Sequence, residues 1–87
     1  STIVSLDNIA KADINIYPNP FSSTLKIESF HIIKQVDIYN TLGQVLFKYY
    51  PNSQYTTIEI NNGKSVGIYY LKVSTIHNTF LKKIIKI

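Results

Sequence analysis

The side chains able to do acid–base or metal chemistry are few in this 87-residue chain, and they are scattered along it. There are two histidines, five carboxylate side chains and no cysteine. Neither His31 nor His77 has a second histidine or a carboxylate at the spacing of a metal-binding motif, so we interpret both as structural or solvated. Without cysteine, disulfides and thiolate metal sites are excluded. The sequence therefore predicts no metal centre and no cofactor.

The carboxylates do not form a catalytic pattern either. Glu28, Asp37 and Glu59 alternate with apolar residues, so we expect them on solvated outer faces of strands. A glycosidase would need two carboxylates converging in a cleft, for which a domain of this size has little room. The sequence contains no Gly-x-Ser-x-Gly, no phosphate-binding glycine loop and no calcium loop. We predict that the chain is not an enzyme.

The charge of the chain is moderately basic, with a formal net charge of +4. Every basic residue apart from the histidines is a lysine, and lysine lacks the bidentate contacts with which arginine reads guanine and phosphate. The seven tyrosines could stack on single-stranded nucleic acid, but their strand-like alternation favours core and sheet positions. We therefore expect no nucleic-acid partner. No apolar run is long enough for a transmembrane segment.

Short segments rich in Ile, Val and Tyr, separated by turn residues, must position whatever site exists. Branched and aromatic residues favour strands, and the expected strands are 14–17, 25–28, 36–39, 45–50, 56–60, 67–74 and 80–87. Residues 40–43 and 61–63 read as turns, the first closing a hairpin between 35–40 and 44–50. This spacing predicts an all-β fold, a small antiparallel immunoglobulin-like β-sandwich of six or seven strands. Residues 1–13 read as a linker from a preceding domain or as its frayed end, and 14–87 as the folded domain.

The last strand has two possible registers. The more apolar face carries Leu81, Ile85 and Ile87, and we expect it to point inward. The alternative turns Phe80 and Ile84 inward, beside Lys82 and Lys86.

Three local patterns carry more specific information. Ile16-Tyr17-Pro18-Asn19-Pro20-Phe21 opens the folded part, residues 36–46 (VDIYNTLGQVL) form a strand, turn and strand, and residues 67–73 (GIYYLKV) precede a terminal KKIIK at 82–86. In this order the chain resembles the type A C-terminal sorting domain of the type IX (Por) secretion system. The resemblance covers 14–87.

The resemblance implies a function that the composition of the chain does not indicate. Such domains end proteins already carried into the periplasm of Gram-negative bacteria, and the secretion machinery recognises them and moves the cargo through the outer membrane. The implied partners are that translocation and processing machinery and an N-terminal cargo domain in the same chain. The implied location is the periplasm in transit, then the cell surface or the extracellular space. A surface protease commonly removes the domain, and we expect cleavage within or before 1–13 because extended backbone is accessible there.

Recognition residues follow from the same motifs. The prolines would stiffen the start of the domain or simply bend an edge strand. Gly67 would permit a tight strand start or a close backbone approach. The terminal lysines would keep an edge strand from pairing with neighbours, or mark a strand that the machinery docks by strand addition. The resulting set is Tyr17, Pro18, Asn19, Pro20, Gly67, Tyr69, Lys82, Lys83 and Lys86.

Two other functions remain open. The chain could be an accessory carbohydrate-binding or fibronectin-like module of a secreted enzyme, if several of Tyr49, Tyr50, Tyr55 and Tyr70 formed one flat platform. Tyrosines with mixed facing and partial burial would argue against this. A structural spacer or oligomerisation domain would instead bury the last strand in a symmetric assembly.

Overall fold

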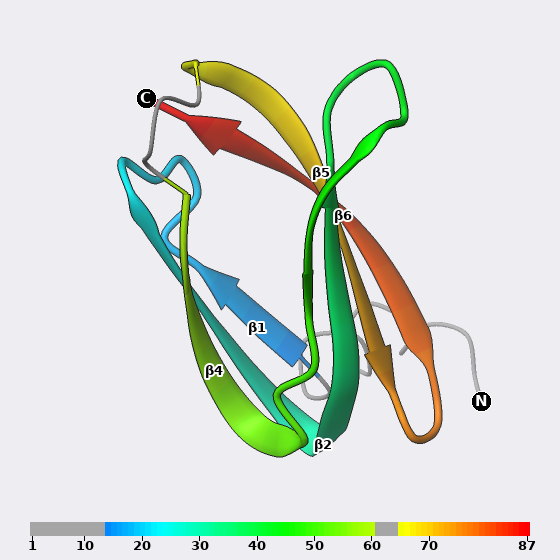
Figure 1. The fold of residues 1–87 in the computed structure, drawn as a ribbon. Coiled ribbons are helices and arrows are strands. Elements are labelled where there is room, and N and C mark those ends of the chain that lie inside the picture. The colour runs from blue at the N-terminus through cyan, green and yellow to red at the C-terminus, as the bar shows by residue number, and fades with distance from the viewer. Residues whose placement is uncertain (1–13, 61–64) are drawn as a thin grey trace, which may run out of the picture.

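The computed structural model describes residues 14–60 and 65–87, and every regular element in these ranges is a β-strand (Figure 1). The expected linker at 1–13 and the expected turn at 61–63 both lie outside the described residues. The strands are β1 (Ile14–Tyr17), β2 (Thr24–Tyr39), β3 (Val45–Tyr49), β4 (Ser53–Glu59), β5 (Gly67–Thr75) and β6 (Thr79–Lys86).

The long strand β2 belongs to both layers of the fold. Its first part pairs with β4 from Thr24 to Glu28 and with β1 from Lys26 to Ser29. Ile33 pairs with β4 on one side and with β5 on the other, and from there onward β2 continues beside β5 and, from Val36, beside β3. Figure 1 shows β2 descending beside β1 and β4, turning at the bottom and rising beside β3 and β5. Six antiparallel strands in the described ranges thus form a curled sheet, which confirms the all-β, immunoglobulin-like class.

The continuity of β2 differs from the prediction, which placed separate strands at 25–28 and 36–39. The intervening residues contain neither Gly nor Pro and include Ile32 and Ile33, so nothing in them ends a strand. The chain changes partners through register shifts near Ile33 rather than through a turn. The predicted hairpin after β2 is confirmed: Gly43 donates a backbone hydrogen bond to Asn40, and Asn40 donates one to Gln44, each 3.0 Å.

The core lies between the two layers and comes from alternate positions of the strands. Leu25 and Ile27 point inward from the first part of β2, and Val36 and Ile38 from the second. Alternation is what a sheet with one solvated face requires. The other buried hydrophobic residues are Phe21, Ile33, Ile58, Ile60, Tyr69, Leu71, Val73 and Ile84.

The last strand turns its less apolar face inward, so the favoured register was wrong. Ile84 is fully buried, whereas Leu81 is 71% exposed and Ile87 66% exposed. Lys86 makes this register possible because its side chain is buried while its ammonium donates a hydrogen bond to the carbonyl of Ser22. A lysine can bury its aliphatic stem in this way when its charged end finds an oxygen.

Asp37 was also expected on a solvated face and is instead buried, at 5% exposure. Its carboxylate accepts hydrogen bonds from Gln35 Nε2 at 2.8 Å and from the Tyr39 hydroxyl at 3.4 Å. Lys48 on β3 and Lys72 on β5 stand opposite it in register. Asp37 lies in the central strand of its layer, so neighbouring side chains cover a carboxylate that nevertheless points away from the core.

Candidate recognition site at the last strand

The segment after β1 leaves the sheet because of its two prolines. Tyr17 is the last residue of β1, and Pro18 and Pro20 follow, both after cis peptide bonds. Proline has no N–H to donate to a ladder, so the pairing of β1 with β2 ends here. The chain then runs to Phe21, which lies next to the last strand of the domain.

Asn19 joins this segment to β6 through its side chain. Its Oδ1 accepts a hydrogen bond of 3.0 Å from the backbone N–H of Ile85, and its Nδ2 donates one of 3.1 Å to the carbonyl of Lys83. An amide presents the same donor and acceptor as a peptide group. Asn19 therefore occupies the outer edge of β6 as a short piece of strand would.

Phe21 continues the pairing with its backbone. Its N–H donates to the carbonyl of Ile85 at 2.9 Å, and its carbonyl accepts from the N–H of Ile87 at 2.8 Å. Its side chain is fully buried in the core. We name the contacts of Asn19 and Phe21 with residues 83–87 the terminal clamp. Along this stretch the clamp already uses the outward backbone groups of the last strand.

Gly67 lies on the other side of the same strand. It stands opposite Lys86 in the β5–β6 ladder, and Lys86 also forms a parallel bridge with Phe21. Its φ of +133° is a conformation that side chains rarely adopt, but an added Cβ would meet no atom within 4 Å. Gly67 is therefore required for the tight start of β5 rather than for a close approach.

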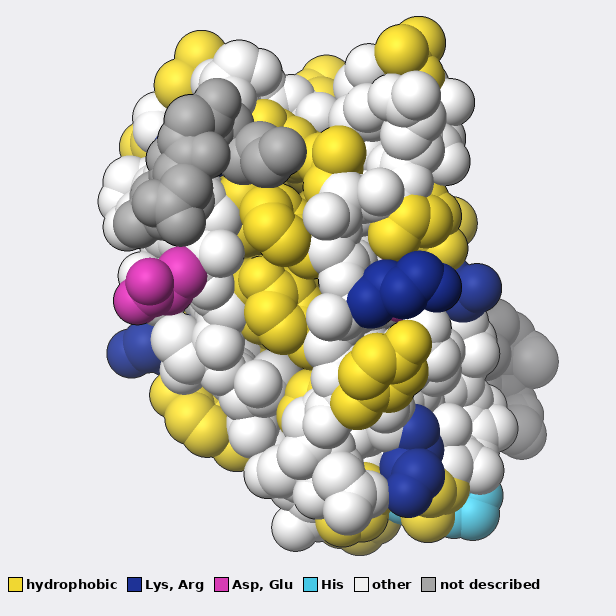
Figure 2. All heavy atoms as spheres, viewed as in Figure 1, with side chains coloured by type: hydrophobic (Ala, Val, Ile, Leu, Met, Phe, Trp, Pro, Cys, Tyr) yellow, Lys and Arg dark blue, Asp and Glu magenta, His cyan; other side chains and the backbone are white. Residues whose placement is uncertain are grey.

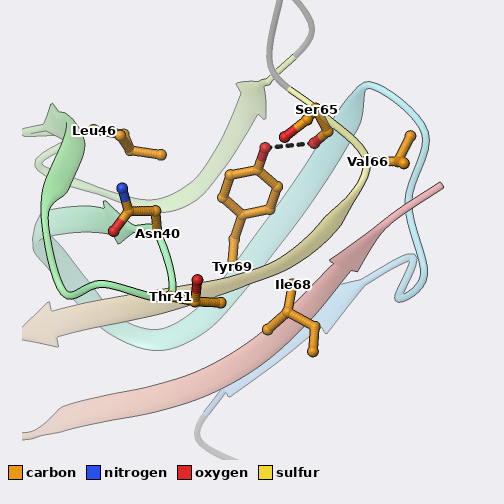
Figure 3. A pocket seen from close by; sticks show the side chains of 7 residues that line it. All are labelled: Asn40, Thr41, Leu46, Ser65, Val66, Ile68 and Tyr69. Atoms are coloured by element: carbon orange, nitrogen blue, oxygen red, sulfur yellow. Dashed lines mark hydrogen bonds between the residues drawn. The ribbon is translucent and has the colours of Figure 1, made fainter.

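Tyr69 is a core residue, 5% exposed and paired with Ile84 of β6. Its hydroxyl donates a hydrogen bond to the carbonyl of Ser65, and the ring lines a hollow of about 390 Å³ (Figure 3). The hollow is also lined by Asn40, Thr41, Leu46, Val66 and Ile68. The Asn40 side chain already bonds to Leu42 and Gln44, so the polar groups of Tyr69 and Asn40 serve the fold itself.

The three terminal lysines have different surroundings. Lys86 is buried, whereas Lys82 and Lys83 are exposed. Lys83 stands opposite Tyr70 on the outer face of its layer. Lys82 lines a second hollow, of about 210 Å³, with Ile14 and Ile16 of β1 and with Phe80 and Leu81. Only two of the three lysines can meet a partner through their ammonium groups while the clamp is closed.

Tyr17 carries the strongest electrostatic perturbation near the clamp. Its hydroxyl donates a 2.6 Å hydrogen bond to Glu28 Oε2, across the β1–β2 pair. The bond to the carboxylate raises the pKa of Tyr17 to about 12, with desolvation adding to the shift, because ionised tyrosine could no longer donate it. Tyr17 thus holds the end of β1 in place just before the prolines.

The tyrosines proposed for sugar stacking do not form one platform. Tyr49 is half-buried and packs against the core. Tyr55 stands opposite Glu28 in one layer, whereas Tyr70 stands opposite Tyr39 in the other. On the face drawn in Figure 2, hydrophobic side chains form a central column and several separate patches. This mixed facing is the arrangement that argues against a carbohydrate-binding module.

Of the nine residues singled out from the sequence, the three lysines lie on β6, and Asn19, Gly67 and Tyr69 pair with it. Tyr17, Pro18 and Pro20 belong to the segment that leads to Asn19 and to Phe21.

The set chosen from the sequence lacked Phe21, an apolar residue directly after Pro-Asn-Pro that belongs to the terminal clamp. It also lacked Ser22, whose carbonyl accepts the hydrogen bond of Lys86. The proximity of His31 and His77, whose ring centroids lie 4.2 Å apart, was missed as well. Among the described residues no group of three or more potential metal ligands gathers.

A small β-sandwich closed by a clamp between its first motif and its last strand is the class of domain that these features define. Residues 15–87 match the sequence profile of the family described as the secretion system C-terminal sorting domain, and the chain belongs to this family. No curated protein matches the chain. Within the part of the chain that the structure describes, no helix is long and apolar enough to span a membrane.

Proposed function

We propose that the domain directs a periplasmic cargo protein across the outer membrane by the type IX secretion system and is cleaved off after export. Membership of the sorting-domain family supports the first part of this proposal. The cargo precedes the domain in the same chain, and the translocation and processing machinery are its partners.

The terminal clamp is the observation that carries the proposal furthest. Asn19 and Phe21 hold residues 83–87 on their outer edge, while β5 pairs with residues 83–86 on the inner edge. The signal that the machinery reads is then a folded surface built from both ends of the domain, not a free C-terminal peptide.

Within this surface the named residues divide into two groups. Asn19, Gly67, Tyr69 and Lys86 shape the last strand through hydrogen bonds, backbone conformation or burial. Lys82 and Lys83 offer exposed charges beside it, while Tyr17, Pro18 and Pro20 are exposed next to Asn19. We assign direct contact with the machinery to the exposed group.

An export assay tests the sorting function. A periplasm-targeted fluorescent protein is fused to residues 1–87, expressed with an intact type IX system, and compared with a fusion that lacks 82–87. Export of the full fusion alone supports a sorting signal that requires the last strand. Export of both moves recognition away from the last strand, and retention of a folded full fusion in the periplasm overturns the proposal.

Cleavage is tested separately by determining the C-terminus of the released cargo by mass spectrometry. The proposal places it within or before 1–13. A C-terminus downstream of Tyr17 contradicts that placement, because cleavage there would cut the folded domain.

A further inference from the structure

The bend of β2 meets the turn between β5 and β6 at the end of the molecule opposite the terminal clamp. His31 lies in the part of β2 between its two sets of partners, and His77 lies in the β5–β6 turn. The N–H of Ile76 donates a 3.3 Å hydrogen bond to the carbonyl of Ile32. Since Ile32 follows His31 and Ile76 precedes His77, this bond fixes the two histidines as neighbours.

The backbone around each histidine is held in place. In the turn, Thr75 Oγ1 accepts hydrogen bonds from the N–H of His77 at 3.1 Å and of Asn78 at 2.9 Å, and the N–H of Thr75 donates to the carbonyl of Asn78 at 2.7 Å. In the bend, the N–H of His31 donates to Ser29 Oγ at 3.1 Å. These hydrogen bonds fix the backbone positions from which the two imidazoles project.

The two rings face each other closely. Their centroids are 4.2 Å apart and their planes are inclined by 60°. The ring of Phe30 packs against His31 edge-on, at 5.0 Å and 73°, and restricts its rotation. Within 14–60 and 65–87, no hydrogen bond to a side-chain nitrogen of either histidine is present, and neither is a buried polar atom without a partner. The ring nitrogens are available to an external ligand.

We propose that His31 and His77 together bind a transition-metal ion, with Zn²⁺ as the simplest case. Imidazole nitrogen is a preferred ligand of zinc, copper and nickel. At metal–nitrogen distances of about 2.0–2.1 Å, the centroids of two imidazoles on one ion lie roughly 5 Å apart. His77 is exposed and can rotate, so a small movement of its ring reaches this separation.

The site supplies two protein ligands, because no third histidine or carboxylate joins the pair among the described residues. Water completes the coordination, which makes the site open and exchangeable, unlike the closed sites of structural zinc. A bound ion would connect the bend of β2 to the β5–β6 turn. It would therefore stabilise the folded state, since the unfolded chain does not hold the two imidazoles together.

The test is a titration of residues 1–87 with ZnCl₂, followed by calorimetry and by NMR of the imidazole ring protons. We expect one ion per chain, shifts in the ring protons of both histidines, and a rise in the melting temperature. In His77→Ala and His31→Ala the affinity should fall at least about tenfold, because each removes one of two ligands. Asn78→Ala is the matched control, since it changes the same turn and keeps both imidazoles.

Each outcome decides the proposal. The NMR arm uses the unmodified chain, so it stands even if His31→Ala does not fold. Zinc that shifts neither ring, or that binds His77→Ala as tightly as the unmodified chain, overturns it and leaves the two rings as a packing contact. These results do not depend on whether the domain directs secretion.

Discussion

The side-chain oxygen of Asn19 accepts a 3.0 Å hydrogen bond from the backbone N–H of Ile85, although 66 residues separate the two. Its side-chain nitrogen meanwhile donates to the carbonyl of Lys83. A single asparagine thus pairs with the edge of the last strand and joins the two ends of the folded domain. The stability of the C-terminal strand should depend on this residue.

Replacing Asn19 with alanine removes both hydrogen bonds at once. A hydrogen bond contributes about 0.5–1.5 kcal/mol net, so Asn19→Ala should lower the free energy of unfolding by roughly 1–2 kcal/mol. Urea denaturation followed by circular dichroism measures this. Asn15→Ala is the control, because Asn15 is exposed on β1, and it should change the free energy by less than about 0.5 kcal/mol. Equal effects of the two would mean that the side-chain hydrogen bonds of Asn19 contribute nothing to stability.

Replacing each of the three terminal lysines should lower the stability of the domain according to how deeply its side chain is buried. Lys86→Ala removes buried methylene groups and the hydrogen bond to Ser22, so it should destabilise the domain by about 1–3 kcal/mol. Lys82 and Lys83 are exposed, so Lys82→Ala and Lys83→Ala should change the free energy of unfolding by less than about 0.5 kcal/mol. The same denaturation experiment compares all three. Similar values for the three variants would show that the inward register of Lys86 is incorrect.

A side chain at position 67 should destabilise the start of β5. The φ of Gly67 is +133°, and a Cβ added there would meet no atom within 4 Å. The cost of Gly67→Ala is therefore backbone strain of about 1–3 kcal/mol rather than a clash. Thermal unfolding of Gly67→Ala measures this strain. Ser65→Ala is the control, because it keeps the backbone carbonyl that accepts the hydrogen bond of Tyr69. A Gly67→Ala variant as stable as the parent would contradict the assigned conformation.

The bond between Tyr17 and Glu28 predicts a titration at high pH. The pKa of Tyr17 is about 12 in the folded chain, above the ordinary tyrosine value of about 10. A raised folded pKa means that this contribution to stability is complete below about pH 10 and is lost as the pH rises through about 12. In Glu28→Gln the pKa of Tyr17 should fall toward its ordinary value, because the negative charge is gone.

Ultraviolet titration detects this change, with Tyr17→Phe in each background to isolate the Tyr17 signal. Tyr49 serves as an internal control, because burial is the main cause that raises its pKa and Glu28 is not among the causes. Tyr17 ionising near pH 10 in the unmodified chain would contradict the hydrogen bond.

The sequence predicted the all-β class and the hairpin at Asn40–Gly43 correctly, because both depend on local signals. Alternation and turn residues act over a few positions. The prediction from sequence was wrong where contacts between distant segments determine which side chains are buried. The inward position of Lys86 depends on the carbonyl of Ser22, and the burial of Asp37 depends on strands β3 and β5 on either side. Neither partner can be read from the neighbouring residues.

The candidate site shows the same division. Asn19, Gly67 and the terminal lysines could be named from local motifs, but not the fact that they meet at one strand. That arrangement arises because the segment after β1 crosses to the edge of β6, a contact between opposite ends of the chain. The nearness of His31 and His77 is equally a product of topology, since the bend of β2 and the β5–β6 turn are far apart in sequence.

The fraction of a folded fluorescent cargo that is exported when residues 1–87 follow it decides whether the clamped domain is a sorting signal. Three fusions are compared in cells with an intact type IX system: the unmodified domain, Asn15→Ala, and Asn19→Ala combined with Phe21→Ala. The third loses the side-chain hydrogen bonds of the clamp and the buried ring that anchors the backbone bonds of residue 21, so that the clamp is weakened. We predict equal export of the first two and a severe loss for the third. A folded cargo that stays in the periplasm with the unmodified domain, or that leaves equally well with the clamp weakened, would contradict the account.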